Sequence, residues 1–418
     1  MQIMQRRKTL SLIIFLFISV LPLFSRARNQ DEILVSKIKV FLDDEELDAD
    51  SEPRGKIKLS TILSYSKFRE GKSFSGKAFA KEIERTKLRL MDSGLFYSAE
   101  VEASDSKKNP GSKVIYVSVQ TGFHLRFGGG KAYGFFGKAA LGGNRNILKG
   151  YLGSNKNGVS YLDENTFGLP LIFGASLLTN APLAIAGKEV LSFDAILKTG
   201  FFLNPELKLG LDLRDEIVCT DKTVSDYEVT VSPYISQRVF LSEKLTVNTE
   251  LRSFSSFCKE EGSHSAEAAI NANYTPFSKI TLAGLLSGGC NISDAKIDLE
   301  KTAIDLYDGL GLANRGIRSG YKSEDLATDC YGLASAEIRW NALSFNLPPS
   351  FPVQFVPFVF TDLALAYDYT DHTSRFLDAY GIGLQINFEC PVFAYFNFSY
   401  GVNHLGERKF IFSAMKSF

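Results

Sequence analysis

Residues 314–321 read Asn-Arg-Gly-Ile-Arg-Ser-Gly-Tyr, and they place two arginines between segments that read as β-strands. On the next two strand-like segments, Glu337 and Asp362 point away from the apolar side, because successive side chains of a strand alternate between its faces. Burying one such charge alone would cost on the order of several kcal/mol, so we expect the charges together. We predict that Arg315 folds inward and pairs with both carboxylates. The alternative is that Arg315 is an exposed loop arginine.

Residues 122–418 alternate apolar and polar side chains with a period of two. In the segment 206–214, for example, four leucines alternate with polar residues or glycine. One side of these segments is too polar for a core that is buried on both faces, whereas water in a lumen would suit it. The pattern predicts a transmembrane antiparallel β-barrel of about 16 strands, each taking roughly 18 residues with its connection. A soluble β-sandwich is the alternative.

Composition supports this class. The chain has 418 residues, with 34 phenylalanines, 17 tyrosines and 34 glycines, and its mean hydropathy is near zero. These values are too polar for a helical membrane protein and too regular for a disordered chain. Lys plus Arg and Asp plus Glu both number 47, so the charge predicts no nucleic-acid partner.

The N-terminus reads as a secretion signal. Three basic residues at 6–8 precede the apolar run 10–24, and Ser25-Arg26-Ala27 offers small residues where a signal peptidase cleaves. We predict a signal peptide over residues 1–27, with an uncleaved anchor as the alternative. Beyond it, no apolar run approaches the ~20 residues of a spanning helix.

Motifs of catalysis and metal binding are missing from the sequence. Its four histidines fall on separate segments without an HExxH pattern, and no Gly-x-Ser-x-Gly elbow or phosphate loop occurs. We therefore expect no enzyme activity, no cofactor and no metal site. Five cysteines occur without CxxC spacing, so their pairing cannot be deduced, and the odd number leaves at least one thiol free or intermolecular.

Residues 31–121 read as a small α+β domain with the order strand, helix, helix, strand, strand (β-α-α-β-β). The predicted elements are strand 33–42, helix 60–66, helix 77–92, strand 95–103 and strand 113–121. Gly94 ends the second helix, as a residue free to adopt positive φ does. Leu95 and Phe96 follow it directly.

The turn Gly94-Leu95-Phe96, with Gly71 and Phe74 ahead of the second helix, resembles a POTRA domain. Such domains are the periplasmic modules of the outer membrane protein 85 superfamily, which includes BamA-like and TamA-like assembly factors, surface-antigen-type barrels and two-partner secretion transporters. The resemblance implies a single POTRA domain over residues 31–121 and an outer-membrane barrel over residues 122–418.

Features of the barrel resemble the same superfamily. Arg315-Gly316 with Tyr321 is similar to the family's Arg-Gly-aromatic loop, which enters the lumen, and Asp362 and Glu337 match its strand acids. The resemblance thus implies the pairing that parity suggests. Phe410, Phe412 and the final Phe418 are similar to a terminal assembly signal.

A barrel closes only where its first and last strands pair. We predict these as 123–130 and 407–418. Gly128, Gly129 and Gly130 would weaken that closure, because glycine contributes no packing and loses more entropy than other residues. A simple bend in the strand is the alternative.

The resemblance implies insertion or translocation of outer-membrane or secreted polypeptides through a lateral seam, with the POTRA domain in the periplasm of a bacterium. The implied partners are unfolded polypeptides, the lipid bilayer, and periplasmic chaperones or accessory lipoproteins. The alternatives are a passive pore or surface-exposed structural protein on the same scaffold, and a two-partner-secretion-type transporter.

Overall fold

The fold is taken from a computed structural model. It describes residues 32–47, 57–122, 124–130, 133–153, 156–180, 183–185, 188–221, 223–258, 262–291, 297–298, 317–347, 351–388 and 394–415. The predicted signal peptide, Arg315, Gly316 and Phe418 lie outside these residues.

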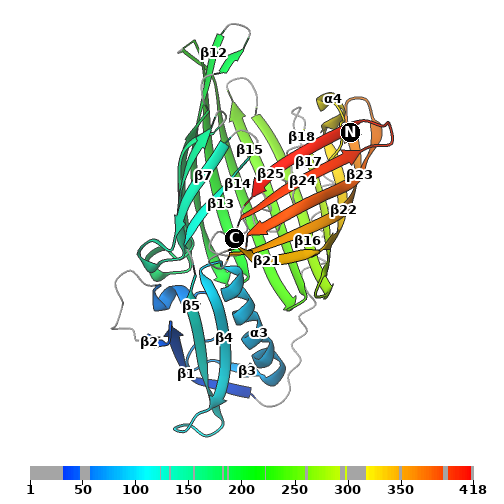
Figure 1. The fold of residues 1–418 in the computed structure, drawn as a ribbon. Coiled ribbons are helices and arrows are strands. Elements are labelled where there is room, and N and C mark those ends of the chain that lie inside the picture. Colours follow the sequence, from blue (N-terminus) through cyan, green and yellow to red (C-terminus); the bar gives the residue numbers. More distant parts are fainter. Residues whose placement is uncertain are drawn as a thin grey trace.

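A small mixed sheet with two helices forms the N-terminal domain, drawn in blue and cyan in Figure 1. The sheet order is β2-β1-β5-β4, with β3 also paired to β1; β1 and β5 are parallel and β4 and β5 antiparallel. This arrangement confirms the predicted β-α-α-β-β order and adds two short strands. The elements are β1 (Glu32–Leu42), β2 (Glu45–Leu47), α2 (Leu59–Leu63), β3 (Ser73–Ser75), α3 (Gly76–Asp92), β4 (Phe96–Asp105) and β5 (Ser112–Thr121).

The core of this domain lies between α3 and the sheet. Phe79 and Leu90 on one stripe of α3 are buried, and Ile83 packs beside them. Helix residues spaced in this way share one face, so the helix covers the sheet with its apolar side. Among the described residues, no helix is both long enough and apolar enough to cross a bilayer.

The turn after α3 contacts the chain at Gly122, where it leaves the domain for the barrel. Gly94 has φ of 64°, the left-handed conformation that ends a helix at little cost for glycine. Leu95 and Phe96 are buried, and the backbone carbonyl of Leu95 accepts a 2.8 Å hydrogen bond from the N–H of Gly122. A Cβ at Gly122 would lie 2.9 Å from that carbonyl oxygen, so only glycine fits at this junction.

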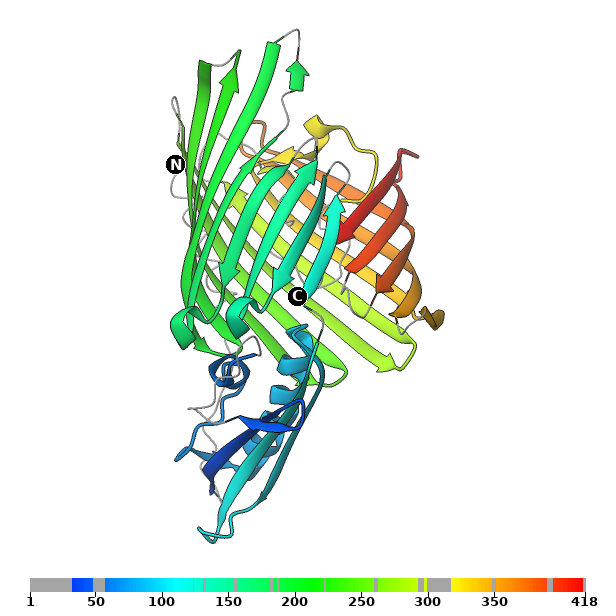
Figure 2. The same cartoon turned by 60° about the vertical axis from the view of Figure 1, so that its left-hand side comes forward.

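The rest of the described chain closes into an antiparallel barrel, with the domain at one end of it (Figures 1 and 2). β11 continues β10 along β12, and β21 continues β20 along β22, so the described elements make 16 strands. The predicted fold class and strand number are confirmed. The elements of the barrel are β6 (Leu125–Gly130), β7 (Tyr133–Ala139), β8 (Asn146–Gly153), β9 (Asn157–Asp163), β10 (Leu171–Thr179), β11 (Leu183–Ile185), β12 (Lys188–Asn204), β13 (Leu207–Thr220), β14 (Thr223–Ser242), β15 (Leu245–Cys258), β16 (Gly262–Phe277), β17 (Ile280–Asn291), β20 (Cys330–Trp340), β21 (Leu343–Leu347), β22 (Phe351–Asp368), β23 (Thr373–Phe388), β24 (Ala394–Val402) and β25 (Arg408–Met415).

Strand parity separates the two faces of the wall. On β20, Ile338 and Trp340 are each 54% exposed on the outer face, whereas Ser335 and Glu337 are buried on the inner one. An apolar outer face with polar residues inside is the pattern of a membrane-spanning barrel.

The connection from β17 to β20 includes β18 (Ile297–Asp298), α4 (Ser323–Leu326) and β19 (Ala327–Thr328).

A disulfide joins the two strands at the ends of that connection. Cys290 on β17 and Cys330 on β20 face each other in the strand register and are bonded, with 4.1 Å between their Cα atoms. Cys219 is a free thiol, and Cys390 lies outside the described residues. The pairing follows from the register of two strands 40 residues apart in sequence, which spacing alone does not reveal.

Candidate functional site

A buried arginine holds two carboxylates on the inner wall of the barrel. Arg318 donates to both carboxylate oxygens of Asp362, from Nε to Oδ2 at 2.8 Å and from NH2 to Oδ1 at 2.7 Å. Its NH1 group donates to Glu337 Oε1. All three side chains have 0% exposure. Bidentate, charge-assisted bonds of this kind fix orientation as well as distance.

The described arginine of this cluster is Arg318, whereas the prediction named Arg315. Arg315 and Gly316 lie outside the described residues. The backbone of Arg318 rests against Gly401 on β24, where a Cβ would lie 1.8 Å from the Arg318 carbonyl oxygen. This close approach brings position 318 to the wall. The alternation of side chains along the strands correctly placed Glu337 and Asp362 on the inner face. The loop has no such alternation, so its sequence does not indicate which arginine reaches them.

A second arginine completes the charge balance. Arg339 donates to Glu337 Oε2 from Nε at 2.8 Å and from NH2 at 2.6 Å. Glu337 therefore lies between two guanidinium groups, and two arginines face two acids. The Arg318 guanidinium also lies over the ring of Phe360, 3.7 Å from its centroid, a favourable cation–π contact. Such pairing makes the burial of these charges tolerable.

The first and last strands of the barrel, β6 and β25, meet at what we call the seam. Among the described residues, one register pair joins them, Gly129 with Ala414. β25 pairs with β24 along its whole length, by contrast. Figure 2 shows β6 in cyan beside β25 in red. Gly128, Gly129 and Gly130 end β6 and pair with β7, so the predicted glycine run stands at the closure.

The predicted terminal aromatics lie in different surroundings: one is on the outer surface of the barrel, and one packs against other rings. Phe410 is 64% exposed on the outer face. Phe412 stacks with Phe396 and Phe398 of β24, at centroid distances of 6.3 and 5.0 Å. Phe418 lies outside the described residues. The rings thus bind β25 to β24, the side away from the seam.

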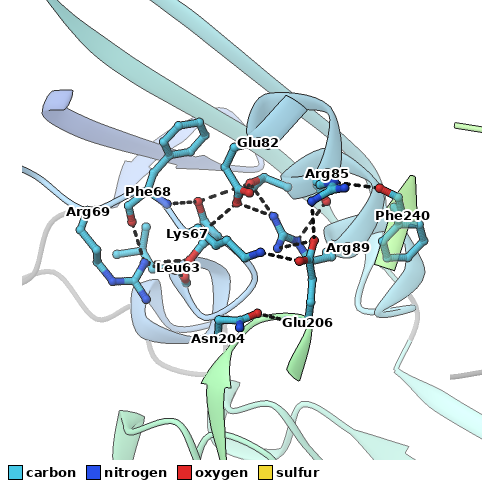
Figure 3. Close-up of polar contacts among 12 residues, drawn as sticks. Leu63, Lys67, Phe68, Arg69, Glu82, Arg85, Arg89, Asn204, Glu206 and Phe240 are labelled. Atoms are coloured by element: carbon cyan, nitrogen blue, oxygen red, sulfur yellow. Dashed lines mark hydrogen bonds and ion pairs between the residues drawn. The ribbon is translucent and has the colours of Figure 1, made fainter. Parts of the chain in front are cut away.

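Charged residues also dock the N-terminal domain onto the barrel (Figure 3). Glu206, in the turn from β12 to β13, is 6% exposed and bonds to Lys67 Nζ. Its Oε1 lies 3.5 Å from Arg85 NH1 and 3.5 Å from Arg89 NH1, both on α3. Three cations of the domain therefore converge on one acid of the barrel. Burial lowers the pKa of Arg89, while Glu82 and Glu206 act in the opposite direction.

Other contacts surround this cluster. Arg85 Nε donates to the Phe240 carbonyl at 2.8 Å, and the Arg238 and Asp92 side chains form an ion pair at 2.5 Å. The domain's apolar core continues into Ala139, Ala140 and Ile147 of the barrel. Sequence reasoning missed this interface, because an acid in a strand turn normally reads as a solvated residue.

We find no metal centre in the described parts of the chain, where no three His, Cys, Asp or Glu side chains group as ligands would.

No protein-family model matches the sequence, and no curated protein matches it. Among solved structures it is similar to CdiB from Escherichia coli, with a TM-score of 0.55 and 11% identity over 95% of this chain and 92% of that chain. The chain has the fold of CdiB. CdiB from Acinetobacter baumannii aligns with a TM-score of 0.54 and 12% identity over 93% of this chain and 74% of that chain.

BamA from Haemophilus ducreyi lacking POTRA domains 1–3 also matches, with a TM-score of 0.42 and 14% identity over 92% of this chain and 85% of that chain. The CdiB matches alone support the shared architecture.

We expect Arg318→Ala to destabilise the barrel by about 3–5 kcal/mol, because it leaves two buried carboxylates without their arginine. Samples are heated to graded temperatures before electrophoresis. The temperature at which the fast-migrating band of the folded barrel disappears measures the loss of stability. Arg315→Ala is the matched variant, since it removes the other arginine of the same stretch. A larger loss with Arg315→Ala than with Arg318→Ala would contradict the assignment.

We expect Glu206→Gln to loosen the domain, because Lys67, Arg85 and Arg89 then lose the barrel carboxylate that they share, and Glu82 of the domain balances only Arg89. Spin labels on the β4–β5 and β16–β17 turns should give a broadened distance distribution, while each part stays folded. Glu243→Gln, an exposed acid in the β14–β15 turn, is the control and should leave the distribution narrow. An equally narrow distribution in Glu206→Gln would show that the cluster does not hold the domain.

Proposed function

We propose that this chain is an outer-membrane protein of the outer membrane protein 85 superfamily that inserts or translocates other polypeptides through its seam. The observation that carries the proposal is the closure of the barrel, where one described pair, Gly129 with Ala414, joins β6 to β25. Neighbouring strands elsewhere pair along most of their length. Among the described pairings, the seam is therefore the place where the wall separates most easily.

An open seam exposes a sheet edge to lipid, and such an edge needs a pairing partner. An unpaired backbone group in the bilayer core costs several kcal/mol, so a long ladder of hydrogen bonds cannot open without a replacement partner. A client strand that enters an open seam supplies that partner by backbone pairing, which does not depend on its sequence. One described native pair across the seam keeps the energy of this first step low.

The Arg318 cluster has a complementary role in this proposal. Asp362 and Glu337 lie on β22 and β20, whose pairing with each other is extensive. By tying the inner loop to these two strands, the cluster keeps their part of the wall in shape while the seam separates. We propose that the N-terminal domain lies in the periplasm, where it receives unfolded polypeptides, with chaperones or accessory lipoproteins as further partners. We propose no catalytic activity.

A secretion transporter is the second candidate, and the likeness to CdiB favours it. Both CdiB structures match over more than nine-tenths of this chain, and this likeness is consistent with a two-partner-secretion transporter. This candidate shares the barrel and domain with the assembly factor but differs in its client. One secreted polypeptide would depend on it, rather than many barrel proteins.

Locking the seam tests the proposal. The variant Gly129→Cys with Ala414→Cys, in a chain whose cysteines 219, 258 and 390 are replaced by serine, forms a disulfide across the seam. In cells that carry the locked variant, we expect lower levels of several outer-membrane barrel proteins, or of one secreted polypeptide if the chain is a transporter. We expect a reductant to restore these levels. Quantitative mass spectrometry of the outer membrane and the medium measures both.

A matched cross-link within the wall controls for cysteine chemistry. Ser399→Cys with Ile411→Cys joins the paired strands β24 and β25 and should leave both protein populations normal. If the seam-locked chain also leaves both populations normal, the proposal is wrong and a passive pore or structural protein fits better.

A further inference from the structure

We propose that Tyr321, Asp378 and His404 form a second anchor of the inner segment, residues 317–321, and that this anchor positions the hairpin carrying the seam strand β25. The role of this anchor in handling clients rests on the proposed function, whereas its effect on the position of β25 does not. Tyr321, Asp378 and His404 are thus positioning residues for the seam.

Side-chain contacts join three elements at this point. The Tyr321 hydroxyl donates to Asp378 Oδ1 on β23 at 3.0 Å and accepts from the Asp378 backbone N–H at 3.2 Å. His404, in the turn between β24 and β25, lies with Nδ1 2.6 Å from the same Oδ1. Its backbone N–H also donates to that oxygen at 3.3 Å. One carboxylate therefore links the inner segment to β23 and to the last hairpin.

The turn that holds His404 is itself tightly bonded. Asn403 Nδ2 donates to Glu407 Oε2 at 2.9 Å, and the Glu407 N–H donates back to Asn403 Oδ1 at 2.9 Å. The Asn403 N–H donates to the Glu407 carbonyl at 3.1 Å. Because these bonds close the turn, a constraint on His404 is passed directly to Arg408, the first residue of β25.

Backbone packing brings the inner segment onto the same hairpin. A Cβ at Gly320 would lie 2.8 Å from the carbonyl oxygen of Arg408 and 3.0 Å from its nitrogen. The segment also presses on Gly401 of β24 through the Arg318 carbonyl. Glycines at these two points let the segment lie directly against β24 and β25. This observation is independent of the hydrogen bonds of Tyr321.

The two anchors act on different parts of the wall. Arg318 bonds to β20 and β22, and β23 and β24 stand between β22 and β25 in the barrel order. Tyr321 instead reaches β23 and the β24–β25 turn. The inner segment is therefore fixed to the stable wall at Arg318 and restrains the seam edge at Tyr321.

Hydrogen exchange in the full chain, folded in lipid vesicles without any client, tests the anchor. We expect Tyr321→Phe to speed exchange of β25 amides on the order of tenfold, the effect of one lost hydrogen bond to a carboxylate. Exchange in β22 should stay unchanged. Arg318→Ala should speed exchange in both strands. Tyr400→Phe, which alters an outward-facing phenol of β24, is the control.

Asp378→Asn and His404→Gln supply further variants if Tyr321→Phe does not fold. Cross-linking of Gly129→Cys with Ala414→Cys should also slow in each anchor variant, because β25 then samples positions away from β6. In the Tyr321, Asp378 and His404 variants, unchanged β25 exchange, or equal acceleration in β22 and β25, would overturn the proposal. Since neither readout needs a client, failure of the proposed function leaves this result interpretable.

Discussion

The guanidinium of Arg318, buried between Asp362 and Glu337, is the interaction on which the inner organisation of the barrel depends. A charge without solvent contact is stable only if its partners are in place, so this cluster forms as a unit or not at all. It therefore fixes the path of residues 317–321 against the wall. Ile317 and Tyr321 pack within the inner apolar cluster that includes Phe358 and Phe360, so the position of the arginine also sets the packing around it.

A second constraint comes from the closure of the sheet. Sixteen strands remove every edge only if β6 meets β25, and their described contact is one register pair. Stabilising contacts lie on both sides of this described pair. The domain is bonded to the turns that precede β8, β13 and β15, and the inner segment is bonded to β20, β22 and β23. The seam thus lies between two regions that are held separately.

The sequence predicts the parts of this structure that depend on local periodicity. Alternation identified the barrel, its strand number and the inward direction of Glu337 and Asp362, and Gly94 marked the end of α3. Long-range choices could not be read in this way. The place of Arg318 in the cluster depends on the close approach at Gly401. The Cys290–Cys330 bond depends on strand register, and Glu206 meets Lys67 from 139 residues away. Each is decided by tertiary packing, for which neighbouring residues give no signal.

The most direct test of the central claim is a double-mutant cycle on Arg318 and Asp362. Trp340, the only tryptophan of the chain, stands on β20 close in sequence to Glu337 and reports unfolding in urea by its fluorescence. If the pair organises the interior, Arg318→Leu and Asp362→Leu will each destabilise strongly, and the double variant will recover part of the loss, with a coupling of about 2–3 kcal/mol. Additive losses, with no coupling, would contradict the account.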